Sequence, residues 1–169
     1  MVRNDRGMHR CGMQRKMERE FAIMATVDVR EPDIVIRGRK VVGGVVEGEA
    51  LVTQQTISGW GGVNPMKGEV IESHHELRGQ SFAGKILVFP GAKGSSGWSG
   101  VFHMTRLTDK APLGMLFNIT TTKAALGAVV LRVPTLTDFD IDPLDHIETG
   151  DRVRIDADKG EVLVWKKSV

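Results

Sequence analysis

The chain has little cysteine, no long apolar run and almost no net charge, and each of these absences excludes a class of protein. Cys11 is the only cysteine among 169 residues, so the chain cannot build an internal disulfide or an all-cysteine metal cluster. No apolar stretch approaches the roughly 20 residues of a membrane-spanning helix, and the N-terminus lacks the apolar core of a secretory signal. These absences favour a cytoplasmic protein without a membrane partner.

The basic residues gather at the front of the chain. Residues 1–30 hold seven Lys or Arg against four Asp or Glu, and because the whole chain carries a formal charge of +2, the remainder carries −1. Without clustered cations, the remainder is not expected to bind nucleic acid. We predict a flexible basic arm over 1–30, where several methionines offer alternative starts of translation, and a single domain over 31–169.

Strand patterns at both ends of this domain enclose a segment in which strands and helices alternate. Apolar alternation with glycine breaks predicts strands near 34–36, 41–46, 50–52 and 69–71. Apolar spacing then predicts a strand at 86–89, a helix at 98–110, a strand at 114–117, a helix at 121–126 and a strand at 128–133. The turn at Asp158-Lys159-Gly160 predicts a closing hairpin. The fold class is therefore α/β, with a mixed, barrel-like sheet and a few short helices.

The segment after the strand at 86–89 is the strongest candidate for a functional site. It is rich in glycine and serine and leads into the helix predicted from Trp98. Bare amides before a helix favour an anion pocket, and Ser95 or Ser96 there can act as nucleophile, as general base or as hydrogen-bond donor. The flanking residues fit neither the Gly-x-Ser-x-Gly elbow of hydrolases nor a nucleotide P-loop. A structural glycine turn is the alternative.

Other candidate sites carry weaker patterns. His74 and His75 are adjacent, so they point to opposite faces of a strand, and no third metal ligand stands at a familiar spacing. The acids between Asp138 and Asp145 lack the glycine and glutamate of a calcium loop, which favours a solvated loop. Trp60 lies among glycines, and it either lines a pocket or partner surface or packs into its own core.

Several segments together resemble the small subunit, or swivel domain, of the aconitase X family. The resemblance covers roughly Ile34 to Trp165. It is carried by the segments 57–65, 79–85, 89–99, 111–112 and 150–165. Its most specific part is Gly94-Ser95-Ser96, which is similar to the Gly-Ser-Ser segment that carries the base in true aconitases.

The resemblance implies a swivelling β/β/α domain that docks on a separate large subunit, as a heterodimer, and closes one wall of a dehydratase site. Ser95 would be the catalytic proton acceptor, while Gly94, Ser96, Ser99 and Trp60 would support the loop or bind a small carboxylate substrate. An iron or iron–sulfur centre is expected in the large subunit, and no metal or cofactor on this chain. True aconitases continue with an arginine where this chain has Gly97-Trp98, so carboxylate recognition is expected to come from elsewhere, the partner first of all.

The family implies two substrates. Archaeal members resemble phosphomevalonate dehydratases and bacterial members resemble cis-3-hydroxy-L-proline dehydratases. Trp60, Trp98 and the basic front favour the proline substrate, because a flat apolar side chain suits a pyrrolidine ring. The alternatives are phosphomevalonate, a non-catalytic module that binds an anion or a protein, and a hydrolase using Ser95 or Ser99.

Overall fold

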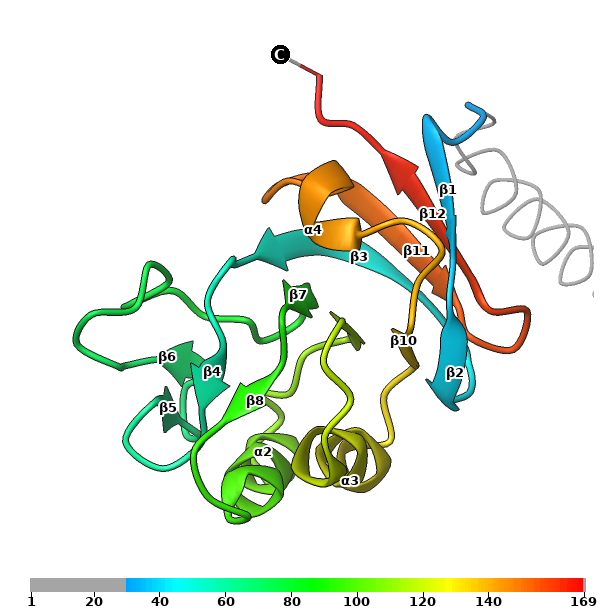
Figure 1. The fold of residues 1–169 in the computed structure, drawn as a ribbon. Coiled ribbons are helices and arrows are strands. Elements are labelled where there is room, and N and C mark those ends of the chain that lie inside the picture. The colour runs from blue at the N-terminus through cyan, green and yellow to red at the C-terminus, as the bar shows by residue number, and fades with distance from the viewer. Residues whose placement is uncertain (1–29, 169) are drawn as a thin grey trace, which may run out of the picture. The chain divides into compact units, whose positions relative to one another are not determined.

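The structure, a computed structural model that describes residues 30–168, is built on an eight-stranded mixed sheet that curls toward a barrel (Figure 1). The strands lie in the order β1-β12-β11-β3-β7-β9-β10-β2. Gly38 alone separates the two edge strands, so the chain passes directly from one edge of the sheet to the other. The bounds are β1 (Ile34–Arg37), β2 (Arg39–Val42), β3 (Val45–Val52), β7 (Ile86–Phe89), β9 (Gly114–Phe117), β10 (Thr135–Thr137), β11 (Arg152–Asp156) and β12 (Glu161–Trp165).

Parallel and antiparallel pairings divide this sheet into two parts. Strands β3, β7, β9 and β10 run parallel, whereas β1, β12, β11 and β3 form antiparallel pairs and β2 pairs antiparallel with β10. The β11–β12 hairpin, with Val153 opposite Val164, confirms the hairpin predicted from its turn residues. The α/β fold class with a barrel-like sheet is confirmed as well.

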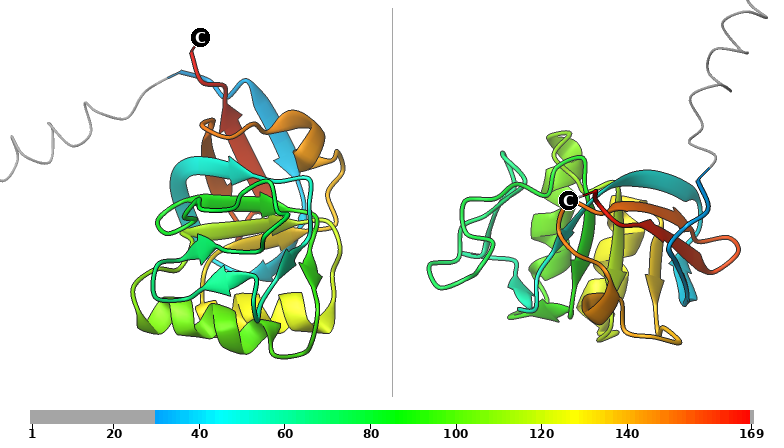
Figure 2. Two further views of the ribbon diagram at one scale, coloured as in Figure 1. Left: turned by 90° about the vertical axis from the view of Figure 1, so that its left-hand side faces the viewer. Right: turned by 90° about the horizontal axis from the view of Figure 1, so that it is seen from above.

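Helices connect the parallel strands and lie along one side of the sheet. Helix α2 (Trp98–Leu107) links β7 to β9, and α3 (Thr122–Leu131) links β9 to β10. The two helices pack side by side (Figures 1 and 2). Because β7 and β9 are parallel neighbours, both helices begin at the same edge of the sheet, where these strands end. A short helix, α4 (Pro143–His146), precedes β11.

The central strands are buried on both faces, which explains their uninterrupted apolar sequence. In β7, Ile86 and Val88 belong to the cluster inside the curled sheet, whereas Leu87 and Phe89 belong to the cluster beneath α2 and α3. The alternation follows the two-residue period of a strand. Strand β7, which precedes the glycine- and serine-rich segment, is therefore packed on both faces.

A lobe between β3 and β7 contains three short strands, β4 (Ile57–Ser58), β5 (Val63–Asn64) and β6 (Glu69–Val70). Strand β4 pairs in parallel with β8 (Ala92–Lys93), which follows β7. This strand pairing joins the lobe to the first residues of the glycine- and serine-rich segment.

Several predicted elements differ from the structure. The strands expected at 41–46 and 50–52 are β2 and one longer strand, β3, with Gly43 and Gly44 between them. The strand expected at 128–133 is wrong, because α3 continues to Leu131 and the next strand is β10. The buried residues of α3 follow a helical spacing, but this spacing is hard to recognise because almost the whole segment is apolar. They are Ala124, Gly127, Ala128 and Leu131. The helix expected over 98–110 ends at Leu107. The arm expected at 1–30, with Cys11, lies almost wholly outside the described residues, and the domain boundary at 30/31 stays a prediction.

Candidate active-site loop

The loop 94–97 is short and lies between two fixed elements. Strand β8 ends at Lys93 and helix α2 begins at Trp98. Gly94 has a φ of +85°, a backbone conformation that other residues rarely adopt. A Cβ at this position would meet open space, so the position requires glycine because of its backbone conformation and not because of crowding. The turn at Gly94 brings the two serines to the surface.

Ser95 is exposed, as its proposed role requires. Its Oγ accepts a hydrogen bond from the backbone N–H of Gly97 at 3.3 Å. A donor aimed at this oxygen stabilises negative charge on it, and the rest of the hydroxyl faces solvent. The fold thus leaves Ser95 accessible to a substrate.

Trp60 lies beside this serine. A Cβ at Gly97 would stand 2.4 Å from Nε1 of Trp60 and 3.4 Å from Oγ of Ser95, so the indole approaches the loop where Gly97 has no side chain. Trp60 is 69% exposed, which excludes the alternative that it packs into its own core. An exposed indole beside Ser95 is available to a ligand or a partner.

Trp98, in contrast, is a core residue. It is 1% exposed, its ring centroid lies 3.8 Å from that of Phe102, and its Nε1–H donates to the carbonyl oxygen of Ile57 at 2.9 Å. The expectation that Trp98 contacts a pyrrolidine ring is therefore wrong. The first large apolar side chain of α2 is thus packed against Phe89 of β7, with ring centroids 6.2 Å apart.

The other two serines have different surroundings. Ser96 is exposed, and Ser99 is buried in the first turn of α2. Oγ of Ser99 donates to the carbonyl oxygen of Ser96 at 3.4 Å. Of the two roles expected for Ser99, this contact fits support of the loop better than substrate binding.

Two lysines flank the loop and differ in their partners. Nζ of Lys93 lies 2.6 Å from Oε1 of Glu72. The hydrogen bond from Lys93 lowers the pKa of Glu72 below its ordinary value, and it outweighs the opposing effect of desolvation. Nζ of Lys123, in α3, donates to the carbonyl oxygen of Gly94 at 2.5 Å. Lys93 immediately precedes the Ser95 turn, but its charge is already paired with Glu72.

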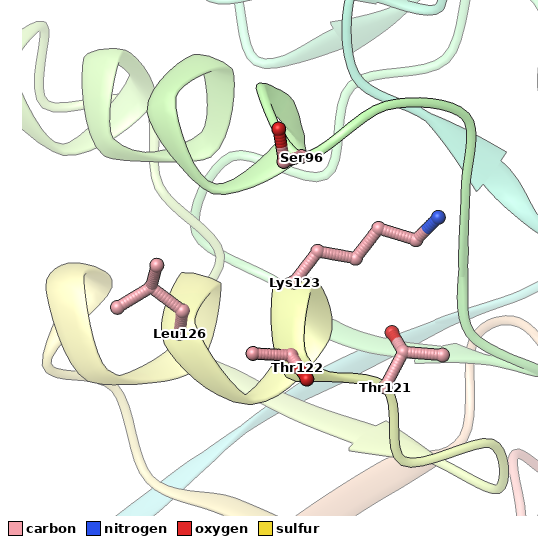
Figure 3. A pocket seen from close by; sticks show the side chains of 5 residues that line it. All are labelled: Ser96, Thr121, Thr122, Lys123 and Leu126. Atoms are coloured by element: carbon pink, nitrogen blue, oxygen red, sulfur yellow. The ribbon is translucent and has the colours of Figure 1, made fainter.

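A pocket of about 350 Å³ opens between the starts of the two helices (Figure 3). The Lys123 side chain extends from α3 toward the loop, Ser96 lines the pocket from the loop before α2, and Thr121 lines it at the start of α3 (Figure 3). Its complete lining is Ser96, Thr121, Thr122, Lys123 and Leu126.

Sequence reasoning missed Lys123 and Glu72. The signal for Lys123 was the neighbouring order of the strands before and after α2, which would have placed the starts of both helices at one edge. No comparable signal pointed to Glu72, which follows β6 in an irregular connection.

The weaker candidates gain no support as metal sites. Within residues 30–168, no group of three His, Cys, Asp or Glu side chains could hold a metal ion. His75 is buried, with Nδ1 accepting from the N–H of Leu77, while His74 is exposed. Asp138, Asp140, Asp142 and Asp145 are exposed, but the loop expected here is interrupted by α4, which Asp142 caps and which contains Asp145. In the same part of the chain, no helix is long and apolar enough to span a bilayer.

Comparison with known proteins gives consistent matches. The aconitase X swivel domain family matches residues 35–164. The phosphomevalonate dehydratase small subunit of Thermococcus gammatolerans is 44% identical over 129 residues, which are 76% of this chain and 96% of that protein. That of Methanosarcina mazei is 34% identical over 134 residues, 79% of this chain and 93% of that protein.

A solved structure agrees with these relatives. The holo-form crystal structure of Thermococcus kodakaraensis aconitase X superimposes with a TM-score of 0.74 at 40% identity, and the match covers 79% of this chain and 99% of that chain. The family match over residues 35–164 includes almost all of the curled sheet, both long helices and the loop with Ser95. The resemblance identified from the sequence is therefore confirmed, and this chain belongs to the aconitase X swivel domain family.

Proposed function

We propose that this chain is the small subunit of an aconitase X-type dehydratase, in which Ser95 takes a proton from the substrate. The observation that carries the proposal is the exposed position of Ser95 on a glycine turn, with a backbone N–H aimed at its Oγ. The similarity to dehydratase small subunits over almost their whole length supports the same assignment. A large subunit would cover the loop and complete the site.

The reaction that fits is the loss of water from a hydroxylated carboxylic acid. The Ser95 alkoxide accepts the proton from the carbon next to the carboxylate, the C–H electron pair forms the new double bond, and the hydroxyl group on the neighbouring carbon leaves as hydroxide. The hydroxide becomes water when it takes up the proton that Ser95 accepted, which restores the alkoxide. An alcohol is a weak base in water, so the role requires its anion to be stabilised. The Gly97 N–H supplies one donor, and exclusion of water by a covering subunit would strengthen it.

An iron centre does not fit the described part of this chain, where no cluster of three ligands exists. No step proposed for this chain therefore involves a metal. Iron or an iron–sulfur centre in the large subunit stays a prediction, as do the heterodimer and the cytoplasmic location.

Phosphomevalonate is the first candidate substrate. The similar small subunits named above are those of phosphomevalonate dehydratases, and the burial of Trp98 removes one of the reasons for preferring cis-3-hydroxy-L-proline. The proline substrate remains the second candidate because of Trp60, whose exposed flat ring beside Ser95 suits a pyrrolidine. A non-catalytic binding module is the alternative of a different class.

Co-expression with an aconitase X-type large subunit from the same genome tests the proposal. The purified complex is given 5-phosphomevalonate or cis-3-hydroxy-L-proline, and the dehydrated product is followed by NMR. Ser95→Ala should lower kcat by about 10²–10⁴-fold, the range for loss of a general base, without dissociating the complex. Ser73→Ala is the control, since Ser73 is an exposed lobe serine. A binding module would bind ligand without turnover, and full activity of Ser95→Ala would refute the assignment of the base.

A further inference from the structure

We infer that Lys123 forms an oxyanion-binding site in this chain, in the pocket beside Ser95, and that this site takes an acidic group of the substrate. That the ligand is the substrate rests on the proposed function, whereas the anion site depends on the described residues alone. Carboxylate or phosphate is the chemistry expected. The sequence had assigned the recognition of such a group to the partner.

The first observation is the charge of Lys123. Within residues 30–168, no carboxylate lies within ion-pair distance of its ammonium group, and its bond is to the neutral carbonyl of Gly94. Lys93, on the other side of the loop, is paired with Glu72. An ammonium group has three donors, so one bond to Gly94 leaves two for a ligand. Lys123 thus brings an uncompensated positive charge to the pocket.

The second observation is the chemistry of the pocket wall. The exposed wall of the pocket is mostly apolar, and no acidic side chain lines it. The hydroxyl of Thr121 accepts from the N–H of Ala124 and keeps its own proton for donation. A volume of about 350 Å³ is ample for a carboxylate or a phosphate group. A lysine in a pocket wall without carboxylates suits an oxyanion and does not suit a cation.

A second pocket provides an internal contrast. It measures about 230 Å³ and is lined by Asn118, Asp138, Phe139 and Asp142. Two carboxylates in its wall would repel an anion. Of the two pockets, the one at Lys123 therefore matches an acidic substrate.

The third observation is the position of Lys123 relative to Ser95. The Gly94 carbonyl that Lys123 binds belongs to the same peptide group as the N–H of Ser95, and Ser96 lines the pocket directly. An acidic group held there would lie beside the loop that carries the proposed base. Lys123 would then both fix the loop and orient the substrate, which raises the share of productive encounters.

The test combines a binding measurement on the full chain with kinetics on the complex. Inorganic phosphate and acetate are titrated separately into the isotope-labelled chain while the amide signals of Ser96, Thr122 and Lys123 are followed by NMR. We expect saturable shifts with at least one anion at millimolar concentration, weakened at least tenfold in Lys123→Met and retained in Lys123→Arg. The control Lys159→Met removes an exposed lysine from the β11–β12 turn and should behave as wild type.

In the complex, Lys123→Met should raise KM for the substrate by about 10–100-fold and change kcat far less, and Lys123→Arg should restore most of the affinity. The two candidate substrates distinguish whether phosphate or carboxylate is the group held, since only phosphomevalonate carries a phosphate. Absence of any saturable shift, or equal effects of Lys123→Met and Lys159→Met, would overturn the inference. If the complex dehydrates neither substrate while the Lys123-dependent shifts persist, the proposed function fails and the anion site stands.

Discussion

Nζ of Lys93 lies 2.6 Å from Oε1 of Glu72, and this ion pair ties the residue before the Ser95 turn to the lobe. Lys93 ends β8 and Glu72 follows β6, so the contact joins two segments distant in sequence. The backbone pairing of β4 with β8 lies alongside it. The role of Lys93 is therefore to position the loop, and the uncompensated charge nearby belongs to Lys123.

Removing this pair should disturb the loop more than the fold. We expect Glu72→Gln to lower kcat of the complex about 3–10-fold through a less ordered Ser95, while the free energy of unfolding falls by no more than about 1 kcal/mol, as for partly exposed ion pairs. Steady-state kinetics and urea unfolding measure the two effects. Glu69→Gln is the matched control, since its partner Lys67 lies 3.8 Å away in the same lobe. Equal loss of kcat in both variants would contradict the positioning role.

The contact between Trp60 and Gly97 predicts a coupled pair of substitutions. Gly97→Ala places a methyl group 2.4 Å from Nε1 of Trp60, so the indole must move. We expect this variant to raise KM several-fold with little effect on unfolding, because Trp60 is exposed. In a Trp60→Ala background, Gly97→Ala should have almost no further effect. Additive losses would show that the two positions act independently.

Much of the fold could be predicted because local patterns and packing agree. The β11–β12 hairpin followed from its turn, and β7 from four apolar residues between breakers. The end of α3 could not be predicted in the same way. Its sequence is apolar almost all round, so helical and strand periods are hard to separate, and burial against α2 and the sheet decides the outcome.

The sequence predicted the consecutive residues of the candidate site and also Trp60, which the structure places beside Ser95. The glycine- and serine-rich segment was found, but its exposure, and the opposite fates of Trp60 and Trp98, depend on tertiary packing. Lys123 and Glu72 reach the loop across 29 and 21 residues respectively, and single-sequence reasoning has no measure of such contacts. The loop could therefore be found from the sequence, whereas its contacts with Lys123 and Glu72 required the structure.

The two helices contain a matched pair of glycines that tests the packing of Trp98. A Cβ at Gly127 would stand 2.2 Å from Cζ3 of the buried Trp98 ring, whereas at Gly100 it would meet open space. We expect Gly127→Ala to destabilise the fold by about 1–3 kcal/mol, as overpacking does, and Gly100→Ala to stabilise it by up to about 1 kcal/mol. Urea unfolding of both variants measures the difference. Similar stabilities would contradict the close contact of α3 with Trp98.

Asp151 predicts how the stability of the fold depends on pH. Its carboxylate is buried and accepts from the N–H groups of Glu148 and Lys167, at 2.8 and 3.0 Å, and from Nζ of Lys166 at 3.0 Å. Burial alone would raise the pKa of Asp151, but these donors outweigh it and hold the pKa below its ordinary value. The carboxylate therefore stabilises the fold above the pKa of an unfolded aspartate, about 4. This contribution is lost as the pH falls through the lower folded value.

Asp151→Asn should remove that contribution at neutral pH. The Asp151 carboxylate accepts from three donors, so the amide NH₂ of Asn would face a donor, and Lys166 would lose its buried charged partner and keep only the exposed Glu148. We expect a loss of about 2–4 kcal/mol at pH 7 and a smaller difference from wild type as the pH falls toward 3. The exposed Asp109, replaced by Asn in the control, should give a curve parallel to wild type. Urea unfolding between pH 3 and 8 measures all three proteins, and a pH-independent difference for Asp151→Asn would show that lost packing, not lost charge, causes the destabilisation.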